Sequence, residues 1–158
     1  SYLAVQKALA ADQFASAADA LRRLQSSAAA IDEGALSDRA RQLWQRENKN
    51  LSKIVGAIQQ ADDIEALRSE FKPLSEQMGQ LARVFGFGDA EPVYELHCPM
   101  AFGGQGAIWY QDHDQVRNPY YGDSMLKCAD RVEPVRRQES PAKDADQPHE
   151  KHQDHSQH

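Results

Sequence analysis

Long apolar runs are missing from this chain of 158 residues. No uncharged segment approaches the ~20 apolar residues that a membrane-spanning helix needs, so we expect no membrane span. An excess of basic residues is missing too, because 18 lysines and arginines stand against 24 aspartates and glutamates, for a formal net charge of −6. With this charge balance and with its basic residues scattered, the chain has no electrostatic footprint for DNA or RNA. We therefore expect no nucleic-acid partner.

Catalytic signatures are absent as well. The sequence contains no Gly-x-Ser-x-Gly motif, no glycine-rich phosphate loop and no His-Glu-x-x-His zinc motif. His97 precedes Cys98, but side chains that are adjacent in sequence usually point apart, so this pair is no evidence for a thiol nucleophile with its base. We predict that the protein is not an enzyme.

Glycine and proline are rare up to about residue 85. Apolar residues recur there at three- and four-residue spacing, which predicts three long amphipathic helices after a short one. Polar residues suited to N-caps precede the long helices at Asp12, at Ser37 and near Asp62 or Asp63. Pro73 should kink the third long helix without ending it. Short connections favour antiparallel neighbours, so the predicted fold class is all-α, an up-and-down helical bundle.

The bundle is expected over residues 1–86, and residues 87–131 have a different composition. Eight of the twelve aromatic residues lie from Phe85 onward, together with six of the nine glycines and both cysteines. We expect this segment to be irregular and packed on the bundle, so that residues 1–131 form one domain. Local patterns indicate a short strand or turn at residues 94–96 and 108–111, and a helical turn at residues 124–128.

Residues 132–158 contain few aliphatic residues among many polar and charged ones. Such a segment buries too little apolar surface to offset the entropy of ordering, which predicts a disordered tail. Histidines recur in it at intervals of three, at His149, His152, His155 and His158. His-rich tracts bind metals, so one interpretation is weak binding of Cu(II) or Zn(II), and the other is a polar tail with chance spacing.

Sulfur is concentrated in two short motifs, which contain Cys98 and Met100 and then Met125 and Cys128. Residues two apart in an extended segment, and three apart in a helical turn, point the same way, so four sulfur atoms could converge. Thiolate and thioether ligands select soft ions such as Cu(I) or Ag(I). His97 is an optional fifth donor, although its side chain should project opposite to that of Cys98.

The residues around these motifs resemble a known family signature. The matching stretches are His97-Cys98-Pro99-Met100-Ala101, Trp109-Tyr110-Gln111, Asn118-Pro119-Tyr120-Tyr121-Gly122 and Ser124-Met125-Leu126-Lys127-Cys128. In this order they resemble a domain of unknown function found at the C-terminus of some periplasmic heavy-metal efflux adaptors and in stand-alone periplasmic proteins. The resemblance spans roughly residues 1–130 and departs from the family at Ala129, where a glycine is expected. It implies a periplasmic location, copper or silver handling and no established catalytic activity.

We therefore predict a periplasmic Cu(I)- or Ag(I)-binding domain associated with a heavy-metal efflux complex. The predicted metal ligands are Cys98, Met100, Met125, Cys128 and His97. The predicted supporting aromatic residues, which would limit water access and position the ligand segments, are Trp109, Tyr120 and Tyr121.

Other interpretations of the same residues remain open. A disulfide between Cys98 and Cys128 would make the segment a structural or adaptor module. Met100 or Met125 could be an apolar filler, and His97 a turn or surface residue. A helical bundle can also hold haem, although the Cys-x-x-Cys-His motif for covalent attachment is absent.

Overall fold

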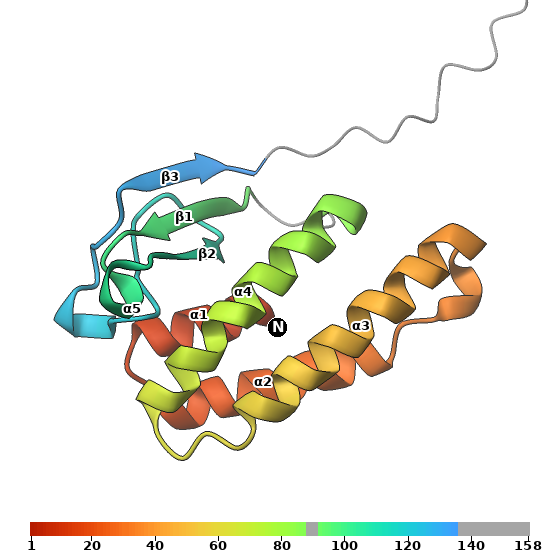
Figure 1. Cartoon of the computed structure of the whole chain (residues 1–158), viewed down its shortest axis with the longest axis horizontal. Helices are drawn as coiled ribbons and strands as arrows, with labels where there is room; N and C mark the ends of the chain where they lie inside the picture. Colours follow the sequence, from red (N-terminus) through yellow and green to blue (C-terminus); the bar gives the residue numbers. More distant parts are fainter. Residues whose placement is uncertain (88–91, 136–158) are drawn as a thin grey trace, which may run out of the picture.

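The computed structural model describes residues 1–87 and 92–135. Its helices are α1 (Tyr2–Ala10), α2 (Phe14–Ala29), α3 (Asp38–Ile58) and α4 (Ile64–Phe85), with a 3-10 turn, η1 (Glu33–Ala35), before α3 (Figure 1). The short helix and three long helices are confirmed. None of the helices within the described residues is both long and apolar enough to cross a membrane.

Two of the three predicted N-caps are confirmed. The Ser37 hydroxyl accepts a hydrogen bond from the Ala40 N–H at 3.3 Å, and the Asp63 carboxylate accepts one from the Ala66 N–H at 2.8 Å. Asp12 does not cap α2, because its φ of 56° places it in the left-handed region and Gln13 precedes the helix. Its carboxylate instead accepts hydrogen bonds from Arg68 and from the Asp123 N–H.

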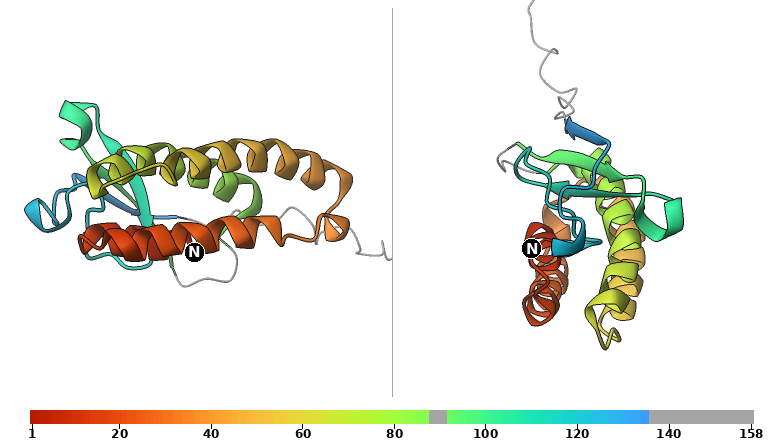
Figure 2. Two further views of the ribbon diagram at one scale, coloured as in Figure 1. Left: turned by 90° about the horizontal axis from the view of Figure 1, so that it is seen from below. Right: turned by 90° about the vertical axis from the view of Figure 1, so that its left-hand side faces the viewer.

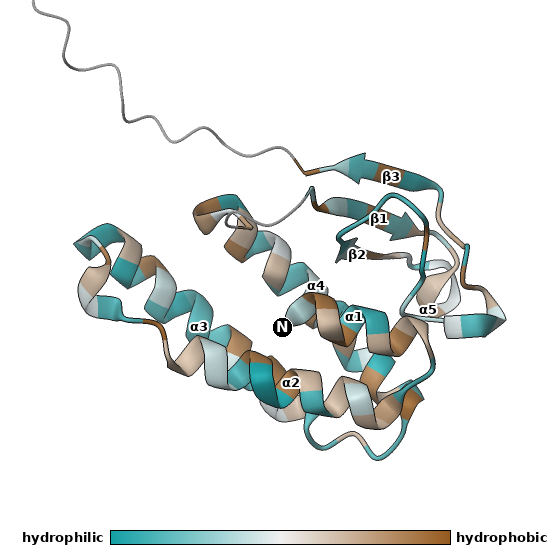
Figure 3. Ribbon diagram, turned by 180° about the vertical axis from the view of Figure 1, so that it is seen from behind, coloured by the Kyte–Doolittle hydropathy of each residue, from teal (hydrophilic) through white to brown (hydrophobic). Residues whose placement is uncertain are grey.

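Helix α4 runs through Pro73 without ending, as predicted. The helices pack as two pairs, α1 on α2 and α3 on α4, with sparser contact between α2 and α3. Hydrophilic and hydrophobic residues alternate along each helix, as expected of amphipathic helices (Figure 3). Helix α1 is much shorter than the other three and pairs with only part of α2.

The all-α prediction is wrong for the C-terminal part of the chain, which contains a three-stranded antiparallel sheet. Its strands are β1 (Tyr94–Cys98), β2 (Ala107–Gln111) and β3 (Arg131–Pro134), in the order β2-β1-β3. In this register, Leu96 lies opposite Trp109 on one side and Val132 on the other. Two short elements, α5 (Ala101–Gly104) and η2 (Gly122–Ser124), lie in the connections.

The short strand or turn indicated at residues 94–96 and 108–111 lies within β1 and β2, but β3 and the pairing of the three strands into a sheet were missed. Strand β3 has four residues, is exposed along its whole length and lacks an apolar alternation. Residues 132–134, predicted to belong to the disordered tail, are part of β3. The rest of that prediction, including the four tail histidines, lies mainly outside the described residues.

Strand β2 attaches the sheet to the helices, since it packs on α4 and α1 (Figure 2). The Tyr2 ring stacks on Phe71 of α4 with centroids 5.4 Å apart, and its edge approaches Tyr110 of β2 at 6.3 Å. Buried residues of the helices and of the sheet form one hydrophobic core. The sheet thereby holds the two cysteine-bearing segments against the helices.

Candidate functional site

The two cysteines meet at one end of the sheet. Cys98 is the last residue of β1 and Cys128 lies between η2 and β3, yet their Sγ atoms are 2.9 Å apart. Both are free thiols, with Cys98 buried and Cys128 half-buried. The two side chains are therefore a pair of convergent sulfur donors from segments distant in the chain.

Backbone pairing on both sides of Cys128 fixes this approach. The Asn118 side-chain amide donates to the Cys128 carbonyl at 2.9 Å, and the Asn118 N–H donates to the Leu126 carbonyl at 2.8 Å. The Asp130 N–H donates to the His97 carbonyl at 3.0 Å, where the pairing of β3 with β1 begins. In the sequence Asn118 stands out only as part of a stretch that resembles the family signature, and its hydrogen bonds to the Cys128 loop are a finding of the structure.

Burial raises the pKa of the Cys128 thiol to about 11, and the neighbouring Cys98 adds to the effect. The Met100 backbone N–H acts in the opposite direction, because it is oriented toward the Cys128 sulfur. At neutral pH Cys128 is therefore a protonated thiol. A bound cation would change this, since a thiol that coordinates a metal is deprotonated.

The two methionines lie at the surface of this region, with exposed fractions of 56% for Met100 and 38% for Met125. This exposure contradicts the interpretation of either as a buried apolar filler. The Cys128 N–H donates to the Met125 carbonyl at 3.0 Å, which closes a turn over these two residues after η2.

The expected extended arrangement of Cys98 and Met100 is wrong. Strand β1 ends at Cys98, and Met100 has a helical backbone conformation with φ −83° and ψ −17°. Pro99 lies between them and lacks the N–H that a continuing strand would use. Met100 is brought near Cys128 by this turn rather than by an i,i+2 relationship with Cys98.

His97 projects away from the thiol pair and is engaged by another residue. Its Nδ1 lies 2.7 Å from the Asp130 carboxylate, and this hydrogen bond is the main cause that lowers the pKa of Asp130. Its Nε2 lies over Gly106, where an added Cβ would come within 2.5 Å of it. The sequence analysis did not identify Asp130 as the partner of His97. The one available signal was its place directly after Ala129, where the sequence departs from the family pattern.

Of the three predicted aromatic residues, Tyr121 lies beside the thiols. Its hydroxyl donates to the Met100 carbonyl at 2.8 Å, and burial followed by proximity to Cys98 and Cys128 raises its pKa. Trp109 and Tyr120 are core residues whose rings meet edge to face at 6.1 Å. They support β2 and the loop after it, and so act on the thiols indirectly.

No three histidine, cysteine, aspartate or glutamate side chains come together as a metal-binding group within residues 1–87 and 92–135. A metal centre here would depend on the two thiols together with thioether sulfur. The donor set is consequently soft and suits a monovalent soft ion better than Mg²⁺, Ca²⁺ or Mn²⁺.

The fold is a helical domain that carries a dithiol-bearing sheet at one end. Residues 1–89 match the family described as protein of unknown function (DUF3347), and since the match covers more than half of the chain, the protein belongs to this family. Neither a curated protein nor a solved structure matches the chain. The family match covers α1 to α4 and stops before the sheet with its cysteines.

Proposed function

We propose that this protein binds Cu(I) or Ag(I) through the thiolates of Cys98 and Cys128, with thioether sulfur from Met100 and Met125 completing the ligand set. The observation that carries the proposal is the 2.9 Å separation of two unbonded sulfur atoms from segments thirty residues apart. The resemblance of the surrounding motifs to periplasmic heavy-metal handling domains supports the same chemistry, a periplasmic location and an efflux complex as partner. It also supports a non-catalytic role.

The geometry of the pair is close to what a metal requires. With metal–sulfur bonds of about 2.3 Å, two thiolates on one ion stand roughly 3.7 to 4.6 Å apart, depending on the coordination angle. The sulfur atoms must therefore move apart by roughly 0.8 to 1.7 Å from their present 2.9 Å, which side-chain rotation achieves. The rotation is available to the Cys128 side chain, because that side chain is half-buried whereas Cys98 is buried at the end of β1.

Methionine suits the remaining positions of such a site. Its side chain is long, unbranched and flexible, so an exposed thioether can swing onto an ion bound between the thiolates. Met100 and Met125 flank the pair from the two different segments. His97 is not part of the proposed ligand set, because its side chain projects away from the thiol pair and its Nε2 lies against Gly106.

Competition titration tests the proposal. The fully reduced protein is titrated anaerobically with Cu(I) against a chromophoric Cu(I) chelator, and with Ag(I) by calorimetry, alongside Cys98→Ser and Cys128→Ser. We expect saturation at one ion per chain and a loss of at least a hundredfold in affinity in each serine variant. Unchanged affinity in both variants, or no competition by the reduced wild-type protein, would refute the proposal.

The same sulfur pair favours a second candidate, a non-catalytic structural or adaptor module closed by a disulfide. A disulfide requires the sulfurs to approach to about 2.05 Å. Closing this loop of about thirty residues would stabilise the fold by roughly 3 to 4 kcal/mol. The two candidates differ in the native protein, because the structural module should be isolated with no free thiols, whereas the metal site requires both thiols to be reduced when it is loaded.

A further inference from the structure

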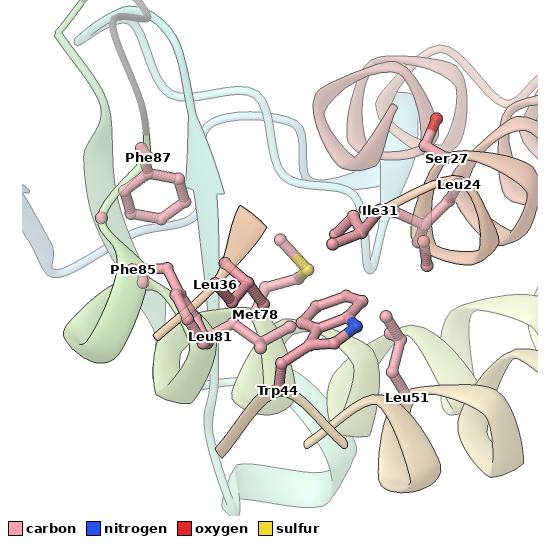
Figure 4. Close-up of a pocket in the computed structure, with 13 residues that line it drawn as sticks. Leu24, Ser27, Ile31, Leu36, Trp44, Leu51, Met78, Leu81, Phe85 and Phe87 are labelled. Carbon is pink, nitrogen blue, oxygen red and sulfur yellow. The ribbon is translucent and has the colours of Figure 1, made fainter. Parts of the chain in front are cut away.

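A cavity of about 310 Å³ lies at the far end of α2, between that helix, the first half of α3 and the last half of α4. The two helices α3 and α4 diverge there (Figure 1). Leu24 of α2, Leu51 of α3 and Leu81 of α4 contribute to its walls, and their side chains face one another across it (Figure 4). The cavity is remote in sequence and structure from the cysteine pair.

The lining is almost entirely apolar and contains no charged residue. Three of its positions are small, namely Ala28, Ala82 and Gly86, each where a larger side chain would fill the space. The hollow is open to solvent on one side, where Ile31 and Phe85 are exposed, so apolar surface faces water there and would gain free energy on being covered. Large apolar side chains around small ones at the hollow are typical of a binding site for an apolar molecule.

One polar group points into this space. Trp44 has only 6% of its surface exposed, and its indole N–H has no hydrogen-bond partner among the described residues. The nitrogen-bearing edge of the ring faces the side of the cavity on which Ile31 and Leu51 lie (Figure 4). The N–H is not fully enclosed by protein, so it is within reach of a molecule in the cavity, and an acceptor atom on a ligand would gain a hydrogen bond from it.

Aromatic side chains form the remaining walls. The Trp44 and Phe85 rings meet edge to face with centroids 6.2 Å apart, and Phe87 lines the cavity beyond them. Such walls favour a flat ring over a flexible chain. The volume is roughly twice that of the ~150 Å³ apolar cavity that holds benzene, which corresponds to a ligand of about twelve non-hydrogen atoms.

We propose that this cavity binds a small uncharged ring compound that carries one hydrogen-bond acceptor, with the Trp44 N–H donating to that acceptor. The acceptor is a carbonyl or similar oxygen, and the ligand has no charge because no side chain of the lining would neutralise it. This site is independent of the proposed metal centre, so either can fail without the other.

The test uses two isosteric probes, 2-acetylnaphthalene and 2-isopropenylnaphthalene, which differ in whether a carbonyl oxygen is present. Binding to the full chain is measured by calorimetry and by the shift in melting temperature. We expect saturable binding of both, with the ketone bound about tenfold more tightly because it makes one additional hydrogen bond. Trp44→Phe should remove this difference while retaining binding of the hydrocarbon.

Two neighbouring alanines of α2 provide matched variants. Ala28→Leu fills the cavity and should abolish binding of both probes, whereas Ala29→Leu changes an exposed position and should leave binding unchanged. Ala82→Leu fills the same space from α4 and replaces Ala28→Leu if circular dichroism shows that the latter does not fold.

Four outcomes would overturn the proposal. The first is an absence of saturable binding of either probe to the wild-type chain. The second is wild-type binding in a folded, cavity-filled variant, and the third is equal affinity of the wild-type chain for the two probes. The fourth is concentration-dependent dimerisation that Ala28→Leu abolishes, because it would assign the cavity to a second copy of the chain.

Discussion

The hydroxyl of Tyr2 accepts a hydrogen bond from the backbone N–H of Tyr110, 108 residues further along the chain, at 3.1 Å. The same hydroxyl lies 2.8 Å from the Ser75 hydroxyl of α4. All three groups are buried, so α1, α4 and β2 are joined at one point in the core. The region that matches the family and the sheet that follows it are thereby held together by a polar contact as well as by apolar packing.

Tyr2→Phe should lower the free energy of unfolding by about 1 to 3 kcal/mol, because it leaves the Tyr110 N–H and the Ser75 hydroxyl buried with fewer partners. Urea unfolding followed by circular dichroism measures the change. Tyr94→Phe is the control, since its half-buried hydroxyl makes no hydrogen bond with any described residue. Equal stability of Tyr2→Phe and wild type would show that this contact contributes nothing.

The Asp12 carboxylate should make the fold sensitive to acid. The Asp123 N–H donates to it at 2.9 Å and the Arg68 guanidinium at 2.5 Å, and these two hydrogen bonds hold the pKa of Asp12 below its usual value. A carboxyl whose pKa is depressed in the folded state contributes stability above its unfolded pKa of about 3.9, and this contribution is lost as the pH falls through the folded pKa.

Asp12→Asn should therefore lower stability at neutral pH and flatten its dependence on pH below about 4. Asparagine tolerates the left-handed backbone at this position, so the change isolates the charge. Urea unfolding from neutral pH to acid measures both effects, with the exposed Asp62→Asn as the control. A wild-type slope in Asp12→Asn would rule out the assigned role.

Each of the two exposed methionines should contribute to the affinity for the metal ion. Met100→Leu and Met125→Leu are each expected to weaken Ag(I) binding several-fold while leaving the melting temperature unchanged, because both side chains are exposed. Met78→Leu is the matched control, since this methionine lines the apolar cavity instead. Equal Ag(I) affinity in all three variants would restrict the site to the cysteines.

Oxidation should switch metal binding off. Mild oxidation of the metal-free protein is expected to join Cys98 and Cys128 within one chain, because their sulfur atoms are already adjacent. The oxidised protein should lose both free thiols and its Cu(I) binding, and reduction should restore both. Prior loading with Ag(I) should protect the thiols, as measured by mass spectrometry after alkylation. Full Cu(I) binding by the disulfide form would contradict the proposed ligands.

The helices could be predicted from sequence because their apolar spacing extends over many turns and because Ser37 and Asp63 are typical caps. Two of the strands were indicated only as a short strand or turn, and the sheet itself could not be predicted, since β3 pairs through contacts with β1 rather than through its own pattern. The role of Asp12 was also set by distant contacts. Its sequence position suggests an N-cap, but its carboxylate accepts hydrogen bonds from Arg68 and from the Asp123 N–H instead.

The sequence likewise indicated some features of the candidate site and not others. The proximity of Cys98 and Cys128 could be anticipated from two matching sulfur motifs, although their spacing alone left both a disulfide and a metal site open. The His97–Asp130 contact and the turn at Met100 depend on the loop geometry after β1, which no periodicity encodes. The cavity beside Trp44 arises from the way three helices diverge, so it could be found only in the structure.

X-ray absorption at the copper edge provides the most direct measurement of sulfur ligation. Reduced protein loaded with one equivalent of Cu(I) should show a first shell made only of sulfur, at about the 2.3 Å typical of metal–thiolate bonds. In Cys98→Ser and Cys128→Ser this shell should lose sulfur and acquire lighter neighbours. A wild-type spectrum dominated by nitrogen or oxygen, or one that neither serine substitution alters, would contradict the assignment of Cys98 and Cys128 as the metal ligands.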